Sequence, residues 1–151
     1  MKKPGSTSDF TSHRNRELYH SFLHVLRTER EMPLRQMFGE AALRPSPRFW
    51  VSEQRAADVI GRMLRGDKLE TMIEKRREMF EEIFARVKVL MNEHPELCMT
   101  HAVSKVIFQE APEFYMTPTS ARTVIYRMRA RARAIHRLRL KIDSIRTQPD
   151  E

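Results

Sequence analysis

The sequence has little of what supports disulfides, glycine-rich loops or membrane spans. Among 151 residues there is one cysteine, Cys98, so no disulfide can form within the chain, and there are only four glycines. The glycines do not cluster as they do where a strand-to-helix turn holds nucleotide phosphates. No apolar run approaches the roughly 20 residues of a membrane-spanning helix. No signal peptide is evident either, so we predict a reducing, cytoplasmic location without membrane insertion.

The residue patterns of enzymes and metal sites are also sparse. His20 and His24 have the i, i+4 spacing of a metal-binding pair, but the segment HSFLH lacks the glutamate that follows the first histidine in zinc hydrolases. Cys98 has His94 and His101 nearby but no second cysteine to complete a zinc set. We therefore predict no enzymatic activity, no metal site and no cofactor, and we assign no catalytic residue.

The chain does have an excess of positive charge, unevenly distributed. Its net charge is +8 and its pI is about 10.1. Residues 1–66 carry a net charge of +5, residues 67–120 carry −3, and residues 121–151 carry +6. An excess of this size indicates a polyanionic partner. The acidic middle segment shows that the protein is not a uniformly basic chain.

A phrase of the sequence occurs twice, 65 residues apart. The first copy, FWVSEQRAADVIGRM, begins at Phe49, and the second, FYMTPTSARTVIYRM, begins at Phe114. Aligning residues 47–65 with residues 112–130 gives seven identities among 19 positions. Upstream, RELYHSFLHVL from Arg16 is similar to REMFEEIFARV from Arg77. Because the similar segments follow one another in the same order, the sequence predicts an internal duplication.

Each copy is predicted to contain three helices, because its apolar residues recur three and four positions apart and nothing alternates long enough for a strand. Ser52 and Thr117 stand where a side-chain oxygen would cap the third helix of each copy. We therefore predict an all-α fold of two tandem three-helix, helix-turn-helix-like units with a long basic C-terminal helix. The predicted boundaries are a disordered N-terminus at 1–13, repeat 1 at 14–66, repeat 2 at 67–131 and a basic helical extension at 132–147.

The duplicated phrase has the form P-x-F-[YW]-x-[ST]-x-x-x-A, which resembles a motif that small, basic, uncharacterised bacterial proteins carry once or twice. The resemblance covers most of the chain and implies a bacterial protein, but it brings no established activity. The order of helices is also similar to that of tandem Myb-like repeats. The spaced tryptophans of that family are absent, however, because Trp50 is the only tryptophan in the chain.

In helix-turn-helix proteins the last helix lies in the major groove of DNA and its polar face contacts base edges. The third helix of the second copy continues into an arginine-rich run without glycine or proline until Pro149, and arginine suits bidentate contacts to phosphate and guanine. We predict a DNA-binding regulator or accessory factor, with DNA favoured over RNA. The candidate contact residues are Arg55, Arg62, Thr119, Arg122, Thr123, Tyr126, Arg127, Arg129, Arg131, Arg133 and Arg137.

Several alternatives stay open at this point. The arginine-rich helix suits a nucleic-acid arm, an amphipathic helix on an anionic membrane surface, or a homodimerisation helix with a solvated basic face. The protein as a whole could be a helical interaction module without nucleic-acid affinity. Arg62 and Arg127 are in register between the copies, and either a phosphate contact or, for Arg62, a salt bridge to Asp58 explains this. The aromatic pairs at 49–50 and 114–115 are expected to pack in the core rather than to stack on bases.

Overall fold

The computed structural model describes residues 8–147, which form six α-helices and no strand. The all-α prediction is therefore confirmed. The helices are α1 Ser8–Thr28, α2 Leu34–Leu43, α3 Glu53–Leu64, α4 Glu74–Glu93, α5 Met99–Ile107 and α6 Pro118–Arg146. Because α1 begins at Ser8 and buries Phe10, residues 8–13 are helical and the disorder predicted for them is wrong. The rest of that prediction, residues 1–7, lies outside the described range.

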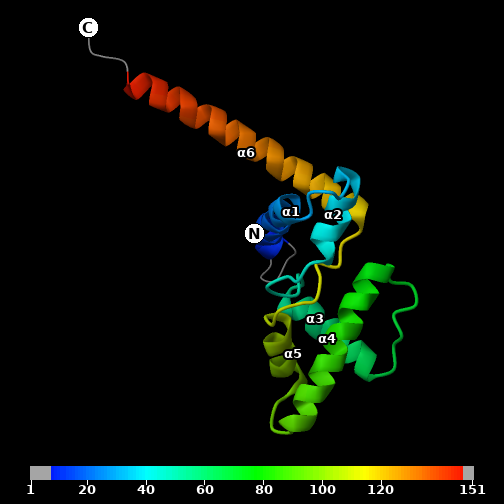
Figure 1. Ribbon diagram of the computed structural model, residues 1–151. Helices are drawn as coiled ribbons and strands as arrows, with labels where there is room; N and C mark the ends of the chain where they lie inside the picture. The colour runs from blue at the N-terminus through cyan, green and yellow to red at the C-terminus, as the bar shows by residue number, and fades with distance from the viewer. Residues whose placement is uncertain (1–7, 148–151) are drawn as a thin grey trace.

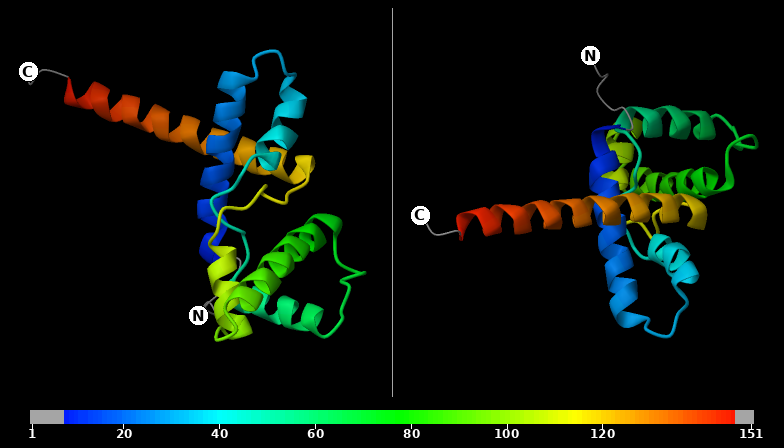
Figure 2. Two further views of the ribbon diagram at one scale, coloured as in Figure 1. Left: turned by 60° about the horizontal axis from the view of Figure 1, so that its bottom comes forward. Right: turned by 90° about the horizontal axis from the view of Figure 1, so that it is seen from above.

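The six helices pack in two groups that do not follow the order of the chain (Figures 1 and 2). One group consists of α1, α2 and α6, and the other consists of α3, α4 and α5. Within residues 8–147, no helix of one group packs against a helix of the other. Each group therefore takes two helices from one half of the chain and its third helix from the other half. The prediction of two tandem units, with α1–α3 and α4–α6 packed in sequence, is not confirmed.

The reason lies in the two connecting segments, residues 44–52 and 108–117, which pair with each other. Ser46 and Ala111 exchange two backbone hydrogen bonds, of 2.9 and 2.8 Å between nitrogen and oxygen. Two further bonds are equivalent to each other under the 65-residue offset of the sequence. They run from the Phe49 N–H to the Ile107 carbonyl and from the Phe114 N–H to the Ala42 carbonyl. This reciprocity is what an approximate two-fold axis through the crossing produces.

Aromatic side chains fill the crossing in the same reciprocal way. Phe49 stacks on Tyr115 with ring centroids 6.1 Å apart, and Trp50 stacks on Phe114 at 6.5 Å. Phe49, Trp50 and Phe114 are buried and Tyr115 is half-buried, so the aromatic pairs are core, as predicted. Tyr115 has a φ of 55°, a left-handed conformation that bulky residues rarely adopt, whereas Trp50 does not. The second connection therefore holds backbone strain at a position where the first does not.

Each group of helices has its own apolar core. Phe49 joins the core of α3, α4 and α5, while Trp50 and Phe114 join that of α1, α2 and α6. The third helices contribute equivalent residues to these cores: Ala56, Val59 and Ile60 from α3, and Ala121, Val124 and Ile125 from α6. The apolar face of each third helix is thus used as the sequence pattern predicts, but against the other half of the chain.

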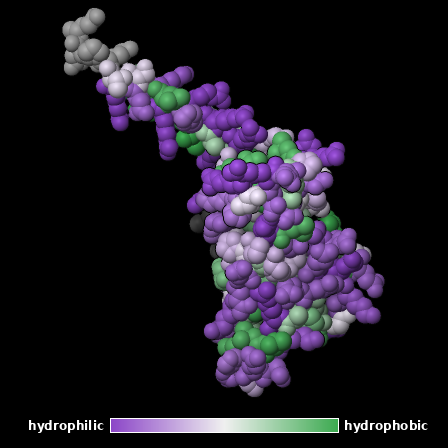
Figure 3. Space-filling view, viewed as in Figure 1, coloured by the Kyte–Doolittle hydropathy of each residue, from purple (hydrophilic) through white to green (hydrophobic). Residues whose placement is uncertain are grey.

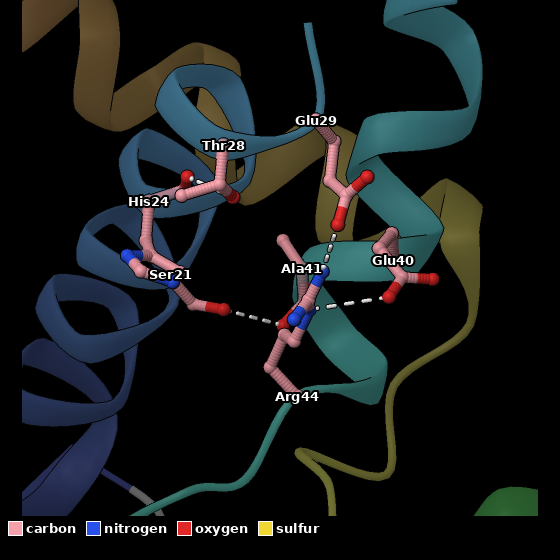
Figure 4. A network of polar contacts seen from close by, with 7 residues as sticks. All are labelled: Ser21, His24, Thr28, Glu29, Glu40, Ala41 and Arg44. Carbon is pink, nitrogen blue, oxygen red and sulfur yellow. Dashed lines mark hydrogen bonds and ion pairs between the residues drawn. The ribbon is translucent and has the colours of Figure 1, made fainter. Parts of the chain in front are cut away.

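Polar contacts hold α2 against α1 beside the crossing (Figure 4). The Ser21 hydroxyl of α1 donates a hydrogen bond of 2.8 Å to the Ala41 carbonyl near the end of α2. Arg44, the residue after α2, lies 3.2 Å from the Glu29 carboxylate and 3.1 Å from that of Glu40. These contacts fix the point at which the chain leaves the first group for the second.

Candidate nucleic-acid interface

The start of α6 repeats the start of α3. The N–H of Ser120 donates to Thr117 Oγ1 at 3.2 Å, and the N–H of Arg55 donates to Ser52 Oγ at 3.1 Å. Pro118 occupies the first turn of α6, where the missing N–H of proline costs nothing because that group has no partner in the helix. Both predicted caps are confirmed. The cap of α6 fixes where the helix starts and therefore which side chains of its first turn face outward.

α6 is packed over its first turns and free beyond them. Ala121, Val124 and Ile125 are buried against α1 and α2, and Met128 is half-buried. From residue 129 to residue 147 every residue is exposed. At a rise of about 1.5 Å per residue, residues 129–146 extend about 27 Å. Figure 1 shows this part projecting away from both groups of helices.

The outward face of α6 carries four arginines and a tyrosine. Positions 122, 126, 129, 133 and 137 are separated by steps of three and four, so they share one face of the helix, to one side of the buried residues. We call Arg122, Arg129, Arg133 and Arg137 the basic stripe. At its packed end, the Arg122 guanidinium lies 5.4 Å from the Tyr126 ring centroid, and that ring lies 5.3 Å from Phe38 of α2. Tyr126 thus lies between Arg122 and the core of α1, α2 and α6.

The positive charge of α6 has no carboxylate partner within the described range. α6 has nine Lys and Arg residues and one acidic residue, Asp143. None of the ion pairs among residues 8–147 includes a basic residue of α6. Like charges at i, i+4, such as Arg129 and Arg133, destabilise a helix by roughly 0.2–0.5 kcal/mol per pair. A polyanion bound along α6 would remove this cost. Basic residues elsewhere do have carboxylate partners, among them Arg44, Arg62, Lys75 and Arg86.

The structure brings together the predicted contact residues of the second copy but not those of the first. The α6 residues among them are all exposed on one helix: Thr119, Arg122, Thr123, Tyr126, Arg127, Arg129, Arg131, Arg133 and Arg137. Arg55 and Arg62 lie on α3, which makes no contact with α6. Arg62 Nε lies 3.2 Å from Asp67, so its salt-bridge partner is Asp67 and not Asp58, which was one of the two alternatives left open by the sequence.

Some basic residues of the surface were missing from the candidates. Arg139, Lys141 and Arg146 are as exposed as the others on α6, and the same run of charge in the sequence indicates them. Arg48, by contrast, has a structural role. Its guanidinium lies 4.4 Å from the Phe108 ring centroid and donates to the Val51 carbonyl, and burial lowers its pKa.

Other kinds of site find no support in the part of the chain that the structure describes. No three His, Cys, Asp or Glu side chains lie close enough there to hold a metal ion. His20 and His24 line a shallow, open hollow together with Glu17 and Arg44. No helix in residues 8–147 combines the length and apolarity needed to cross a bilayer.

Comparison with known proteins adds no relative. No protein-family model matches the chain, and no curated protein or solved structure matches it. A function is therefore inferred from geometry and charge alone.

Proposed function

We propose that this protein binds DNA, as a small regulator or accessory factor, and that α6 is its contact helix. The observation that carries the proposal is the free part of α6, residues 129–146, which is exposed on every side and has no carboxylate partner among residues 8–147. A helix that is free on every side fits the major groove of DNA, which is about 12 Å wide and has phosphates on both walls.

The faces of α6 suggest how its residues would be used. With the basic stripe toward the groove, Arg129, Arg133 and Arg137 reach the phosphates along it, and arginine suits bidentate contacts to phosphate. Arg131 and Arg139 lie on other faces of the helix, toward the phosphates. Thr119, Arg122, Thr123 and Tyr126 lie nearer the body of the protein and would contact the DNA backbone at one edge. Arg55 and Arg62 lie in the other group of helices and stay a prediction.

The crossing supports a finer description of the fold as two duplicated three-helix units that have exchanged their third helices. The hydrogen bonds and ring stacks of the crossing occur in pairs that are equivalent under the 65-residue offset. In this description the second unit's third helix, α6, packs on the first unit's α1 and α2. The DNA-binding helix of the second copy is thus held by helices of the first.

Double-stranded DNA suits α6 better than double-stranded RNA does. The major groove of A-form RNA is too deep and narrow for side chains to read, and proteins recognise RNA mainly at single strands and loops by stacking aromatic rings on bases. The free part of α6 has no Phe, Tyr or Trp, so base stacking there would fall to His136 and the arginines. We therefore favour duplex DNA.

A titration with random-sequence duplex DNA, followed by fluorescence anisotropy over a salt series, tests the proposal. If six basic residues contact phosphates, the logarithm of the binding constant falls with the logarithm of salt at a slope of roughly −5. Failure to bind at low salt, or binding that does not depend on salt, contradicts the proposal.

A duplex RNA of the same length should compete less well than the DNA, and equal competition would contradict the preference for DNA.

Two triple variants distinguish contacts on α6 from net charge. The variant R129Q/R133Q/R137Q removes three exposed arginines from α6, and R30Q/R65Q/R76Q removes three exposed arginines from other helices and loops. We expect the first variant to reduce the salt slope by about 3, since each lost phosphate contact is worth about 0.9. The second should leave the slope almost unchanged. Equal losses in both would show that overall charge, and not α6, holds the DNA.

A further inference from the structure

The face of α6 opposite the basic stripe carries apolar side chains that nothing in the described chain covers. We call Ile135, Leu138, Ile142 and Ile145 the apolar stripe; their side chains are 44%, 59%, 41% and 71% exposed. They continue the face of α6 that is buried nearer its start. In Figure 3 the projecting helix shows hydrophobic residues set between hydrophilic ones.

The spacing of the apolar stripe fits one partner helix. Its residues are separated by steps of three, four and three, which are the a and d positions of two heptads, with isoleucine at both a positions. A stripe confined to a and d is the narrow contact of a coiled coil, whereas a helix packed on a domain core has a wider apolar face. Ala132 and Ala134 border the stripe with small side chains and leave room for a neighbouring helix.

The charges beside the stripe indicate the chemistry of that helix. Arg139 and Arg146 lie at e positions and Lys141 lies at a g position, and these positions select the partner of a coiled coil through ion pairs. The only acidic residue of the projecting part is Asp143. We propose that the apolar stripe binds an acidic amphipathic helix of another protein, one with apolar residues at the same spacing and carboxylates beside them.

A second copy of this chain is a poor occupant. If two apolar stripes paired in either direction, the residues facing each other beside the contact would be arginine, lysine or alanine, with no carboxylate at these positions. The helix of this chain that is richest in acidic residues, α4, has five of them but also five Lys and Arg residues. None of the six described helices of a second copy has a net negative charge that would match α6.

An anionic membrane surface fits less well than an acidic helix. Helices that lie in a membrane interface have a broad apolar face that usually includes Trp or Phe. The projecting part of α6 has no Trp, Phe or Tyr, and Arg131 and Arg139 interrupt its apolar side. The narrow stripe matches one helix better than a lipid surface.

Because the two stripes lie on opposite faces of α6, the acidic helix and DNA use different stripes and share the flanking residue Arg139. The inference does not depend on DNA binding, and each activity has its own readout. If both hold, α6 joins a DNA site to a protein that carries the acidic helix.

The probe for this proposal is a synthetic, labelled peptide of about three heptads, with Ile or Leu at a and d and Glu at e and g. Its binding to the full chain is measured by anisotropy. The variant L138Q/I142Q removes the centre of the apolar stripe, and L140Q is the matched control. Leu140 is 55% exposed, like its neighbours, but lies on the basic side of the helix.

We expect the wild type and L140Q to bind the peptide with similar affinity. L138Q/I142Q should bind it about a hundredfold more weakly, because two large apolar side chains lose their buried contact, and its affinity for duplex DNA should not change. Circular dichroism should show the same helix content in all three proteins, because the substituted residues are exposed.

Several outcomes would overturn the proposal. One is that the peptide does not bind to the wild type. Another is that it binds equally well to L138Q/I142Q, which would show that charge alone attracts it. Self-association of the wild type, seen by sedimentation and lost in L138Q/I142Q, would assign the stripe to a second copy. Binding to vesicles of phosphatidylserine and phosphatidylcholine, lost in the same variant while peptide binding is unchanged, would assign it to a membrane.

Discussion

The two third helices, α3 and α6, start from equivalent caps and bury equivalent residues, but they end differently. α3 has 12 residues and is followed by Gly66 with a φ of 101°, the left-handed conformation in which glycine commonly ends a helix. The residue 65 positions later is Arg131, and α6 continues past it to a length of 29 residues. A glycine in one copy and an arginine in the other thus separate a helix that stays within its group from one that projects.

This difference separates the features that the two halves of the chain share from those that they do not. Caps, core residues and the crossing are shared, and they build two similar groups of helices. The charge and the uncovered apolar residues lie where α6 continues beyond the point at which α3 ends. Both proposed activities therefore depend on the part of the second copy that has no counterpart in the first.

The largest effect expected concerns the exchange of α3 and α6 between the halves. Because each group needs helices from both halves, residues 1–66 and 67–151 expressed separately should each lose most of their helical structure. When mixed, they should recover the circular dichroism of the intact chain and elute together in size-exclusion chromatography. A half that folds cooperatively by itself would contradict the exchanged packing.

The next effect concerns the shared core. Ile60 of α3 and Ile125 of α6 are 0% and 1% exposed and occupy equivalent positions. Replacing either by alanine should lower the free energy of unfolding by about 2–5 kcal/mol, as measured by urea denaturation. The control I135A on the projecting part should change it by less than about 0.5 kcal/mol. A much larger loss at one core position than at the other would break the equivalence of the two groups.

The caps should have smaller and similar effects. Ser52→Ala and Thr117→Ala each remove the oxygen that accepts a backbone N–H at the start of a third helix. Each substitution should lower the free energy of unfolding by about 1 kcal/mol in the same denaturation measurement. No loss in either variant would show that these hydrogen bonds do not hold the helix starts.

The smallest effect concerns the strained connection. Burial raises the pKa of Tyr115 well above its ordinary value. A raised pKa in the folded state contributes stability that is present below about pH 10, the ordinary tyrosine pKa, and is lost as the pH rises beyond it. Tyr115→Phe should therefore reduce the loss of stability between neutral pH and about pH 11, measured by thermal unfolding. An unchanged pH profile would show that Tyr115 does not contribute to it.

The local features of the fold could be predicted from the sequence, because they depend on neighbouring residues. Ser52 and Thr117 cap helices through bonds to residues three positions on, and the apolar spacing of both third helices identifies their buried faces. The packing of each third helix against the other half of the chain could not be predicted. Ile60 and Ile125 occupy equivalent positions in the two groups, so the pattern cannot tell which half of the chain each helix packs against.

The candidate site likewise has a part that could be predicted from the sequence and a part that could not. The exposed arginines of α6 follow from the spacing of residues on one helix, so the sequence indicates all of them. Whether Arg55 joins them depends on where α3 lies, and the exchange places α3 in the other group. The pairing of Arg62 with Asp67 depends on the turn after α3, which brings residues five positions apart within 3.2 Å of each other.

The most direct test of the account is to end the chain after Arg131, where the first copy has Gly66. Removing residues 132–151 takes away no buried residue of the described range, so the thermal unfolding midpoint should not change. Duplex DNA should bind far more weakly, with a salt slope reduced by about 4, because five basic residues are lost. Unchanged DNA affinity and an unchanged slope in a folded protein would contradict the assignment of function to the projecting part of α6.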